Sequence, residues 1–317
     1  MRRSGLKIML GLLGLVNPLA HIMALCITLG TLGFLCAIAI TVLAANLLLT
    51  VMDVSPWNLT FGAGAVMMIL CAVFRAILRY GEQTCGHYIA FKLLAILRDH
   101  VFGALRRLAP AKLEGRGRGD LISLVTSDIE LLEVFYAHTI APVCIAVLVS
   151  AIMTGLIGSF DMRLGVLALI AYLIVGAFIP LVSAKMGREH GMKARGQLGA
   201  LSSYYLESLR GIKETLQYSQ DENRARAIHE KTAELNRLQG EIKRHEGVAS
   251  SWSGASVMGL TIAMLAAGLY LKVEFSALVL TTVSLSASFG PVLALANLSA
   301  TMDQTLASGE RVLSLLE

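Results

Sequence analysis

The sequence predicts an all-α membrane protein with six transmembrane helices and long cytosolic helical extensions. Three observations support this prediction: 56% of the 317 residues are hydrophobic, only 15% are charged, and the basic residues gather in two stretches of the chain. Because a soluble globular domain has about 25% charged residues, most of this surface must face lipid. The same composition excludes intrinsic disorder, a collagen-like repeat and a disulfide scaffold.

Six stretches contain no Asp, Glu, Lys or Arg, and each has at least 21 residues. Crossing a bilayer core takes about 18–20 apolar residues, so each is long enough. The six stretches are Ile8–Met52, Val54–Phe74, Val134–Phe160, Leu164–Ala184, Gly247–Leu271 and Phe275–Met302. The first is too long for one crossing, and Asn17-Pro18 predicts a break in it. Residues 1–16 are therefore expected to form an interfacial elbow and residues 17–317 the six-helix bundle.

The connections between these stretches alternate between short and long. Three short connections lie around Asp53, Asp161 and Lys272, whereas residues 75–133 and 185–246 form segments of 59 and 62 residues. These long segments hold nine and twelve of the 27 basic residues. Basic residues concentrate on the cytoplasmic side of membrane proteins. We therefore expect a multi-pass protein of the plasma (inner) membrane with both termini cytoplasmic, in contact with lipid and with no nucleic-acid partner.

Each long segment is predicted to be a helical hairpin. Arms of about 27 residues reach about 40 Å beyond the membrane, at roughly 1.5 Å per residue. In the second segment apolar residues recur at steps of three and four, as on the packed face of a helix: Leu198, Leu201, Tyr205, Leu209, Ile212 and Leu216. The turns are expected after Leu108-Ala109-Pro110 and near residues 218–223.

Three local motifs accompany this arrangement: residues 119–129 (GDLISLVTSDI), residues 207–213 (ESLRGIK) and residues 307–313 (ASGERVL). Together with the six spans they resemble the transmembrane domain of ABC exporters with helices swapped between subunits, over essentially the whole chain. The resemblance implies alternating-access transport out of the cytoplasm, driven by ATP hydrolysis in a nucleotide-binding domain, and a second transmembrane subunit in a homo- or heterodimer.

The two hairpin turns are the expected contacts with that nucleotide-binding domain. Coupling helix one is predicted at Ala109, Pro110, Ala111, Lys112, Leu113 and Glu114. Coupling helix two is predicted at Gln217, Tyr218, Ser219, Gln220, Asp221 and Glu222. The alternative is that both are only solvated turns, but turns alone do not account for arms of about 40 Å.

A narrower resemblance lies in Arg79-Tyr80-Gly81-Glu82, His87, Phe91-Lys92-Leu93-Leu94, and Tyr136 with Ala141-Pro142. These residues resemble the CydC-type subunit of thiol and amino-acid exporters, which implies such a cargo and, in a heterodimer, a CydD-like partner. Some members of that family associate with haem, and His87 stands at the matching position, although the sequence shows no evident second axial ligand. Lipid or drug cargo is the alternative within the exporter class.

No catalytic site is predicted in this chain. It lacks GxxxxGK[ST], an LSGGQ-like signature, a zinc motif and a nucleophile elbow, and Gly115–Gly119 is interpreted as a flexible turn. ATP and Mg²⁺ are expected to act through a nucleotide-binding domain outside residues 1–317. The pre-linker-like ending favours a chain cut before that domain, with a separately encoded ATPase as the alternative. A secondary carrier or a membrane sensor scaffold is the competing class, and the two long segments argue against a carrier.

Polar and ionisable groups near membrane depth are the candidates for the substrate cavity, because such groups are costly unless they face a cavity or a partner. They are His21, Asn46, Arg75, Arg79, Glu82 and His138. Arg75 and Arg79 lie one helical turn apart and share a face that suits a substrate carboxylate. Alternatively, these arginines snorkel to lipid headgroups or pair with Glu82.

Several other residues have expected structural roles. Asp128, Glu130 and Glu133 are predicted to form ion pairs that hold the cytosolic arms together. Pro180 and Pro291 lie inside apolar stretches and are expected to kink their helices, either as gating hinges or to fit a curved bundle. The five cysteines show no metal-binding spacing and are interpreted as small buried hydrophobic residues.

Overall fold

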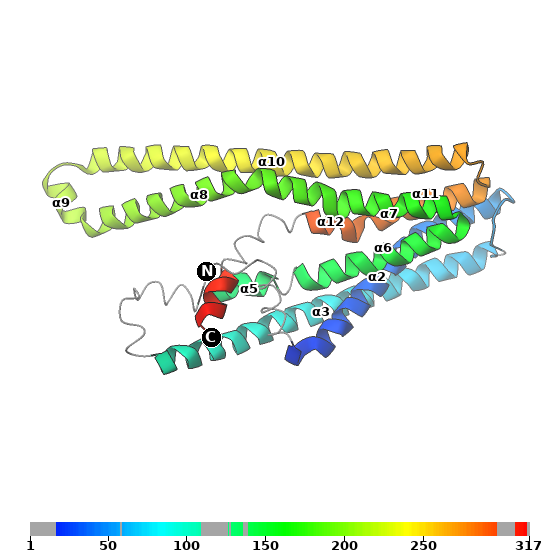
Figure 1. Ribbon diagram of the computed structural model, residues 1–317, viewed down its shortest axis with the longest axis horizontal. Coiled ribbons are helices and arrows are strands. Elements are labelled where there is room, and N and C mark those ends of the chain that lie inside the picture. The colour runs from blue at the N-terminus through cyan, green and yellow to red at the C-terminus, as the bar shows by residue number, and fades with distance from the viewer. Residues whose placement is uncertain are drawn as a thin grey trace. The chain divides into compact units, whose positions relative to one another are not determined.

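The computed structural model describes residues 17–57, 59–108, 126, 128–135, 139–296 and 308–315. Every regular element in these ranges is a helix (Figure 1). Six helices are long and apolar enough to cross a bilayer: Ala20–Val51, Phe61–Leu108, Ala141–Phe160, Met162–Ser183, Asp221–Tyr270 and Phe275–Leu295. The predicted all-α class and the six spans are thus confirmed. The expected elbow, residues 1–16, lies outside the described residues.

The chain divides into two compact units. We call residues 1–177 with 256–317 the membrane unit, and residues 178–255 the hairpin unit. In the membrane unit, α2 (Ala20–Val51) contacts α3 (Phe61–Leu108), α6 (Ala141–Phe160) and α11 (Phe275–Ser288). Its core is an apolar cluster contributed mainly by α2, α6, α7 (Met162–Leu173) and α11, with Val149, Ile157, Leu164 and Leu280 among the fully buried side chains.

A single residue, Asp161, connects α6 to α7, and its contacts explain how so short a connection joins two membrane-spanning helices. Asp161 lies between the two helices, and its carboxylate accepts a hydrogen bond of 2.7 Å from the backbone N–H of Arg163, which caps the start of α7. The helices then approach so closely that a Cβ atom on Gly165 would lie 2.6 Å from the Cα atom of Gly158. A side chain at position 165 would therefore force the two backbones apart.

Three helix ends share one turn geometry. Asp53, Ser219 and Lys272 have positive φ angles of 56°, 50° and 56°. After Asp53 the N–H of Val54 donates to the carbonyl of Leu49 at 3.0 Å, and the corresponding bonds follow Ser219 and Lys272. This is the Schellman pattern, which satisfies the last carbonyls of a helix. Glycine normally occupies the left-handed position, so each of these turns carries some backbone strain.

Both prolines follow an irregular turn of a membrane-spanning helix, and the kinks expected there stay a prediction. Pro180 is the second residue of α8 (Ile179–Arg210) and follows a π-helical segment, η4 (Ile174–Phe178). Pro291 is the second residue of α12 (Gly290–Ala296), directly after the break at Phe289 that ends α11. Proline lacks a backbone N–H and its ring clashes with the preceding turn, which accounts for the irregular turn before each of these residues.

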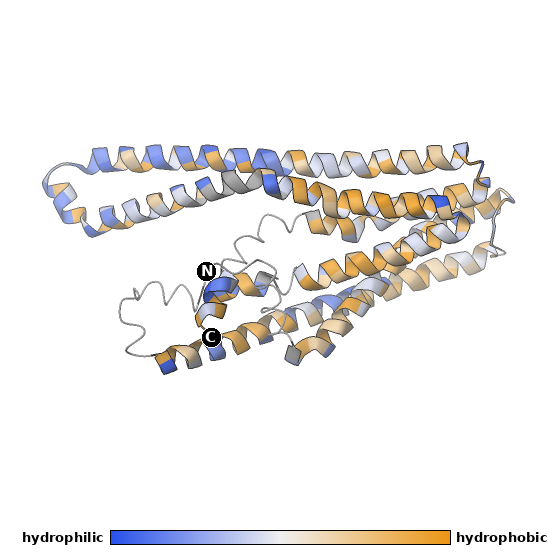
Figure 2. Ribbon diagram, viewed as in Figure 1, coloured by the Kyte–Doolittle hydropathy of each residue, from blue (hydrophilic) through white to orange (hydrophobic). Residues whose placement is uncertain are grey.

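The hairpin unit contains most of α8, the short helix α9 (Ile212–Gln217) and the first part of α10 (Asp221–Tyr270). Figure 2 shows that α10 is hydrophilic towards α9 and hydrophobic towards its other end. The core of this unit is small: Ala194, Leu235 and Leu238 are buried, with Leu201 and Ile242 packed against them. Helical arms joined near residues 218–220 agree with the predicted hairpin.

The predicted apolar stripe on α8 and α9 is helical, but the expectation that it is packed is wrong for most of its members. Leu201 alone among the six joins the small core, and the other five are exposed within the chain: Leu198, Tyr205, Leu209, Ile212 and Leu216. The spacing of these residues identifies an apolar face of α8 and α9. No other described part of the chain covers that face.

Candidate functional site

The candidate site begins where α2 crosses α3. Gly30 lies at the crossing, where an added Cβ atom would clash with the side chain of Ile145 on α6 and lie 3.2 Å from the carboxyl carbon of Glu82. The absence of a side chain at Gly30 therefore leaves room for the Glu82 carboxylate between the helices. The carboxylate is 13% exposed there. Without this glycine the polar groups of α3 could not lie against α2.

A cavity of about 240 Å³ lies beside this crossing. Gly33, Phe34 and Ala37 of α2 line one wall, and three ionisable residues of α3 line the other: Arg75, Arg79 and Glu82. The structure thus brings together three of the six predicted cavity residues. Three of the six lining residues are ionisable, but most of the exposed lining surface is apolar, so the pocket suits a small molecule with both charged and apolar groups.

A second cavity, of about 440 Å³, adjoins the same helices. It is lined by Ala37 and Thr41 of α2, by Arg75 of α3, and by Val283, Ser286 and Ala287 of α11. Arg75 and Ala37 line both cavities. Arg75 therefore marks the junction of the two spaces, and the hydroxyl-bearing residues Thr41 and Ser286 accompany it in the second.

The two arginines have different partners. Nη1 of Arg79 donates to both carboxylate oxygens of Glu82, at 2.8 and 2.7 Å, so the charge of Arg79 is compensated. The predicted pairing with Glu82 is confirmed for this arginine. Among the residues that the structure describes, the Arg75 side chain makes no hydrogen bond or ion pair. A cation without a counter-ion beside apolar helices is the stronger attractor for an anionic ligand.

The other predicted cavity residues lie elsewhere. His21 is exposed in the first turn of α2, and Asn46 is buried nearer the other end of that helix, where its Oδ1 accepts a hydrogen bond of 3.0 Å from Ser55. The Asn46–Ser55 contact ties the end of α2 to the following loop, which is a structural role. His138 lies outside the described residues.

Sequence reasoning missed the non-ionisable lining of the two cavities. Thr41 and Ser286 carry the hydroxyl groups, but they come from helices more than 200 residues apart in the chain. Serine and threonine are common in membrane helices, where their hydroxyls often bond to the preceding turn, as Thr41 does to the Ala37 carbonyl at 3.4 Å. The sequence alone therefore contains no signal that distinguishes Thr41 and Ser286 from the other serines and threonines.

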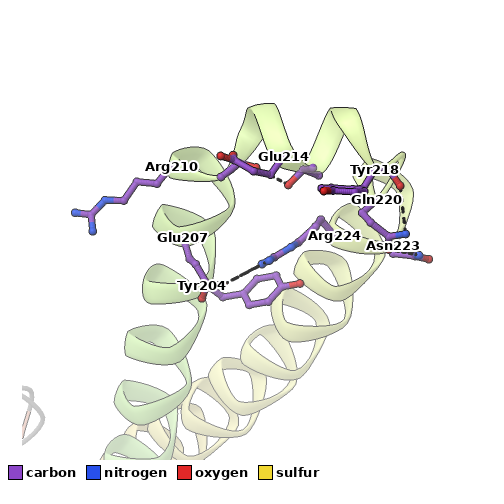
Figure 3. Close-up of a pocket in the computed structure, with 10 residues that line it drawn as sticks. Tyr204, Glu207, Arg210, Glu214, Tyr218, Gln220, Asn223 and Arg224 are labelled. Carbon is purple, nitrogen blue, oxygen red and sulfur yellow. Dashed lines mark hydrogen bonds and ion pairs between the residues drawn. The ribbon is translucent and has the colours of Figure 1, made fainter.

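The tip of the hairpin unit forms a third cavity, of about 650 Å³. Figure 3 shows Arg224 reaching from α10 towards Tyr204 and Glu207 on α8, while Arg210 extends away. The guanidinium carbon of Arg224 lies 5.0 Å from the centre of the Tyr204 ring, and its Nη2 lies 3.5 Å from Glu207 Oε1. These contacts join the two arms just before the turn.

The short helix at this tip lies earlier than the sequence suggested. Coupling helix two was expected at Gln217–Glu222, but the structure has α9 at Ile212–Gln217. Tyr218-Ser219-Gln220 form the turn, and Asp221 begins α10. The correction has a simple cause, because Gly211 separates α9 from α8 and the polar cluster that follows marks the turn, not the helix. Coupling helix one, Ala109–Glu114, lies outside the described residues.

A family model described as "ABC transporter transmembrane region" matches residues 23–294 of the chain. The chain belongs to this family. The match spans all six candidate membrane helices, the α2–α3 cavities and the hairpin tip. The predicted ABC exporter transmembrane domain is therefore confirmed.

The relatives found for this ABC transporter domain carry ATP-binding/permease names. The chain is 46% identical over 320 residues to a "Probable ABC transporter ATP-binding/permease protein" of Haemophilus influenzae. It is 26% identical over 256 residues to the "Glutathione/L-cysteine transport system ATP-binding/permease protein CydC" of the same organism, and 26% identical over 143 residues to CydD of Bacillus subtilis. These alignments cover 100%, 78% and 44% of this chain, and 58%, 44% and 24% of the relatives. The chain thus spans about half the length of its first relatives.

Residues 308–315 of the ABC transporter domain are anchored to Asp128, directly before the short helix α5 (Ile129–Phe135). Buried Asp128 accepts a hydrogen bond of 3.0 Å from Ser308 Oγ and forms an ion pair of 3.1 Å with Arg311. The predicted ion pairs of the acidic cluster are confirmed for Asp128 and, through Arg98 at 3.9 Å, for Glu130. Val312 packs in the same apolar cluster as α3.

His87, the residue implied for haem, is exposed on α3, and its ring stacks on Phe91 at 6.2 Å between centroids. In the described parts of the chain no three His, Cys, Asp or Glu side chains gather as a metal site would require. Phe91 covers one face of the imidazole, and the implied binding of haem at His87 stays a prediction.

Proposed function

We propose that this ABC transporter domain moves a small anionic solute, of the thiol or amino-acid class, out of the cytoplasm by alternating access. The observation that supports this proposal most directly is the position of Arg75, a cation that has no ionic partner among the described residues and lines two adjoining cavities of the membrane unit. A carboxylate accepts paired hydrogen bonds from a guanidinium, so a substrate carboxylate fits this residue.

The charged groups at the cavities support this cargo over a lipid or a drug. Three of the six residues that line the first cavity are ionisable, although most of its exposed surface is apolar, and two hydroxyl-bearing residues line the second. Charged groups at membrane depth are costly unless they meet a polar or charged partner. The printed names of the CydC and CydD relatives, which include glutathione and L-cysteine transport, support the same class.

The hairpin tip is proposed to receive the force of ATP hydrolysis. Leu216 and Tyr218 are 62% and 70% exposed, and Ile212 lies beside them on α9. Exposed apolar residues at the end of two long arms suit contact with a nucleotide-binding domain, because burial of such a patch stabilises docking. The arms are held to one another by Arg224, so movement of the tip carries both helices.

The remaining parts of the proposal concern partners and placement. ATP and Mg²⁺ act through a nucleotide-binding domain, attached or separate, as the ATP-binding/permease names of the relatives suggest. A second transmembrane subunit, CydD-like in a heterodimer, would cover the exposed stripe of α8. The concentration of basic residues in the two long segments supports the inner membrane with both termini cytoplasmic.

The cargo assignment is tested with full-length protein in proteoliposomes. Arg75→Ala is expected to lower the stimulation of ATP hydrolysis by L-cysteine or glutathione at least tenfold, because the carboxylate partner is lost, and Arg75→Lys should retain part of it. Arg163→Ala, which removes a cation outside the cavities, is the matched control. Unchanged stimulation in Arg75→Ala, with the protein still monodisperse in detergent, contradicts the substrate role.

The coupling assignment needs a separate measurement, the number of substrate molecules moved per ATP hydrolysed. The double change Leu216→Ala and Tyr218→Ala is expected to reduce this ratio severalfold, since it removes the exposed apolar contact. Glu222→Ala, at the start of α10, tests the segment that the sequence favoured. A ratio that falls only in Glu222→Ala moves the contact from α9 and Tyr218 to the start of α10.

A further inference from the structure

The two cavities beside α2 and α3 follow one another along a single face of α2. Gly33, Ala37 and Thr41 stand four residues apart in the chain, so they share that face. Gly33 lines the first cavity, Thr41 lines the second, and Ala37 lines both. The helix rises about 12 Å between Gly33 and Thr41, at roughly 1.5 Å per residue. The two cavities are therefore successive parts of one elongated space.

The two parts of this space differ in chemistry. Arg75 of α3 lines both cavities, whereas Arg79 and Glu82 line only the first. The second cavity has the side chains of Thr41 and Ser286, and both of these residues are exposed. Two guanidinium groups and a carboxylate in the first cavity suit the carboxylate and ammonium groups of an amino acid.

The hydroxyl groups of the second cavity suit amide groups. Oγ1 of Thr41 donates to the carbonyl oxygen of Ala37 at 3.4 Å, which leaves its lone pairs to accept a hydrogen bond from an N–H group. Ser286 supplies a hydroxyl from α11, and a hydroxyl can donate to a carbonyl oxygen. An amide has one N–H and one C=O, so a peptide bond in this cavity has a partner for each.

We propose that the two cavities are successive subsites for one short peptide, whose charged amino-acid end binds in the first and whose amide groups lie against Thr41 and Ser286 in the second. The proposal rests on the proposed function, because it places the cargo at the same cations. An extended chain of three residues spans about 10 Å, at roughly 3.3–3.6 Å per residue, which matches the length of the space along α2. A free amino acid occupies only the first cavity. Thr41 and Ser286 thus determine whether the longer solute is accepted.

Filling the second cavity should distinguish the two kinds of solute. Side chains on an α-helix point towards its N-terminus, so the ring of Thr41→Phe extends towards Ala37, where the two cavities meet. Ser286→Phe fills the same cavity from α11. Neither Thr41 nor Ser286 lines the first cavity, so both variants leave its charged groups in place.

The experiment measures ATP hydrolysis by full-length protein in proteoliposomes, with L-cysteine or the tripeptide glutathione as the solute. We expect both solutes to stimulate the unaltered protein. Thr41→Phe and Ser286→Phe should each lower the stimulation by glutathione at least about tenfold, because one extra methylene in a fitted pocket already costs about that much. The stimulation by L-cysteine should stay unchanged. Thr28→Phe is the matched control, since Thr28 is exposed on α2, donates to the Ala24 carbonyl at 2.8 Å in the same way, and lines neither cavity.

The pattern of responses separates the two-subsite proposal from the cargo assignment. Equal loss or equal retention of both stimulations in Thr41→Phe and Ser286→Phe overturns the two subsites and leaves the assignment to Arg75 standing. The same holds if the unaltered protein responds to only one solute. An unaltered protein that responds to neither solute contradicts the proposed cargo, and the two subsites with it. If the phenylalanine variants do not fold, Thr41→Val, which removes the hydroxyl without filling the cavity, should lower the response to glutathione alone, and equal responses to both solutes overturn the proposal.

Discussion

The membrane unit and the hairpin unit hold their helices together by different means. In the membrane unit, large side chains such as Leu97, Met153 and Phe289 are almost fully buried in two apolar clusters. In the hairpin unit the buried core comprises only Ala194, Leu235 and Leu238 among the described residues. Contacts between exposed side chains, such as the Arg224–Glu207 pair at 3.5 Å, provide much of the remaining interaction between the two arms.

This difference shows which parts of the transporter domain are rigidly packed and which can move. Segments with few buried apolar contacts open at a lower free energy than a packed core. The arms must move if the hairpin tip transmits the effect of ATP hydrolysis, and a thin core is consistent with that requirement. The cavity between α2 and α3, by contrast, depends on close packing to hold Glu82 and Arg79 in place.

The largest expected effect comes from filling the α2–α3 crossing. Gly30→Leu should destabilise the membrane unit by about 3 kcal/mol, because the new side chain overlaps Ile145 and displaces Glu82. Thermal denaturation in detergent measures this loss. Gly155→Leu on α6 is the control, since a Cβ atom there meets nothing within 4 Å. Equal melting temperatures for the two variants would show that the crossing is looser than described.

A core truncation in the hairpin unit should have a smaller and more local effect. Leu238→Ala is expected to destabilise the arms by about 2 kcal/mol, at the low end for a buried leucine because the core is thin. Hydrogen exchange of peptides from α8 and α10 should rise, while peptides from α6 keep their protection. Leu209→Ala, at an exposed position of the same unit, should leave exchange unchanged.

If the exchange of α6 rises equally in Leu238→Ala, the two units unfold together and the contrast between them is lost. That outcome would also weaken the coupling proposal, because the arms would then have no independent freedom to move.

A single buried hydrogen bond gives the next smaller effect. Tyr172 and Ser288 join α7 to α11 through their hydroxyls at 2.5 Å, beside a Tyr172–Phe289 ring contact. Tyr172→Phe should cost about 0.6 kcal/mol, the average for interhelical hydrogen bonds in membranes, because Ser288 retains its bond to the Leu285 carbonyl. Thermal denaturation in detergent measures it, and a loss above about 2 kcal/mol would mean that the ring packing depends on the hydroxyl.

Much of the fold was predictable from the sequence, because length and charge decide what can cross a bilayer. The spans, the hairpin whose arms join near residues 218–220 and the irregular turns before Pro180 and Pro291 follow from composition and from proline geometry. Within the site, the spacing of Arg75 and Arg79 predicted a shared face, and both do line one cavity.

What could not be predicted depends on contacts between distant segments. Nothing local distinguishes Thr41 or Ser286 from other hydroxyl residues, since their role arises only where α2 meets α11. The sequence could not show which of Arg75 and Arg79 pairs with Glu82, because the pairing depends on the three-dimensional position of the Glu82 carboxylate. The short helix at the hairpin tip lies before the segment predicted as coupling helix two, because Gly211 already separates α9 from α8 and the polar cluster that follows forms the turn.

The smallest expected effect is a gain, and it tests whether the hairpin tip stores backbone strain. Ser219 adopts a φ of 50°, and the bonds from Ser219 to Leu216 at 3.2 Å and from Gln220 to Thr215 at 2.9 Å fix that geometry. Ser219→Gly should stabilise the tip by about 0.5 kcal/mol, because glycine enters the left-handed region freely and the relief exceeds its entropic penalty. Hydrogen exchange of peptides spanning the turn measures the gain. Ser219→Ala, which keeps the strain, is the control, and a glycine variant that exchanges faster than the alanine variant would show that the turn is not strained.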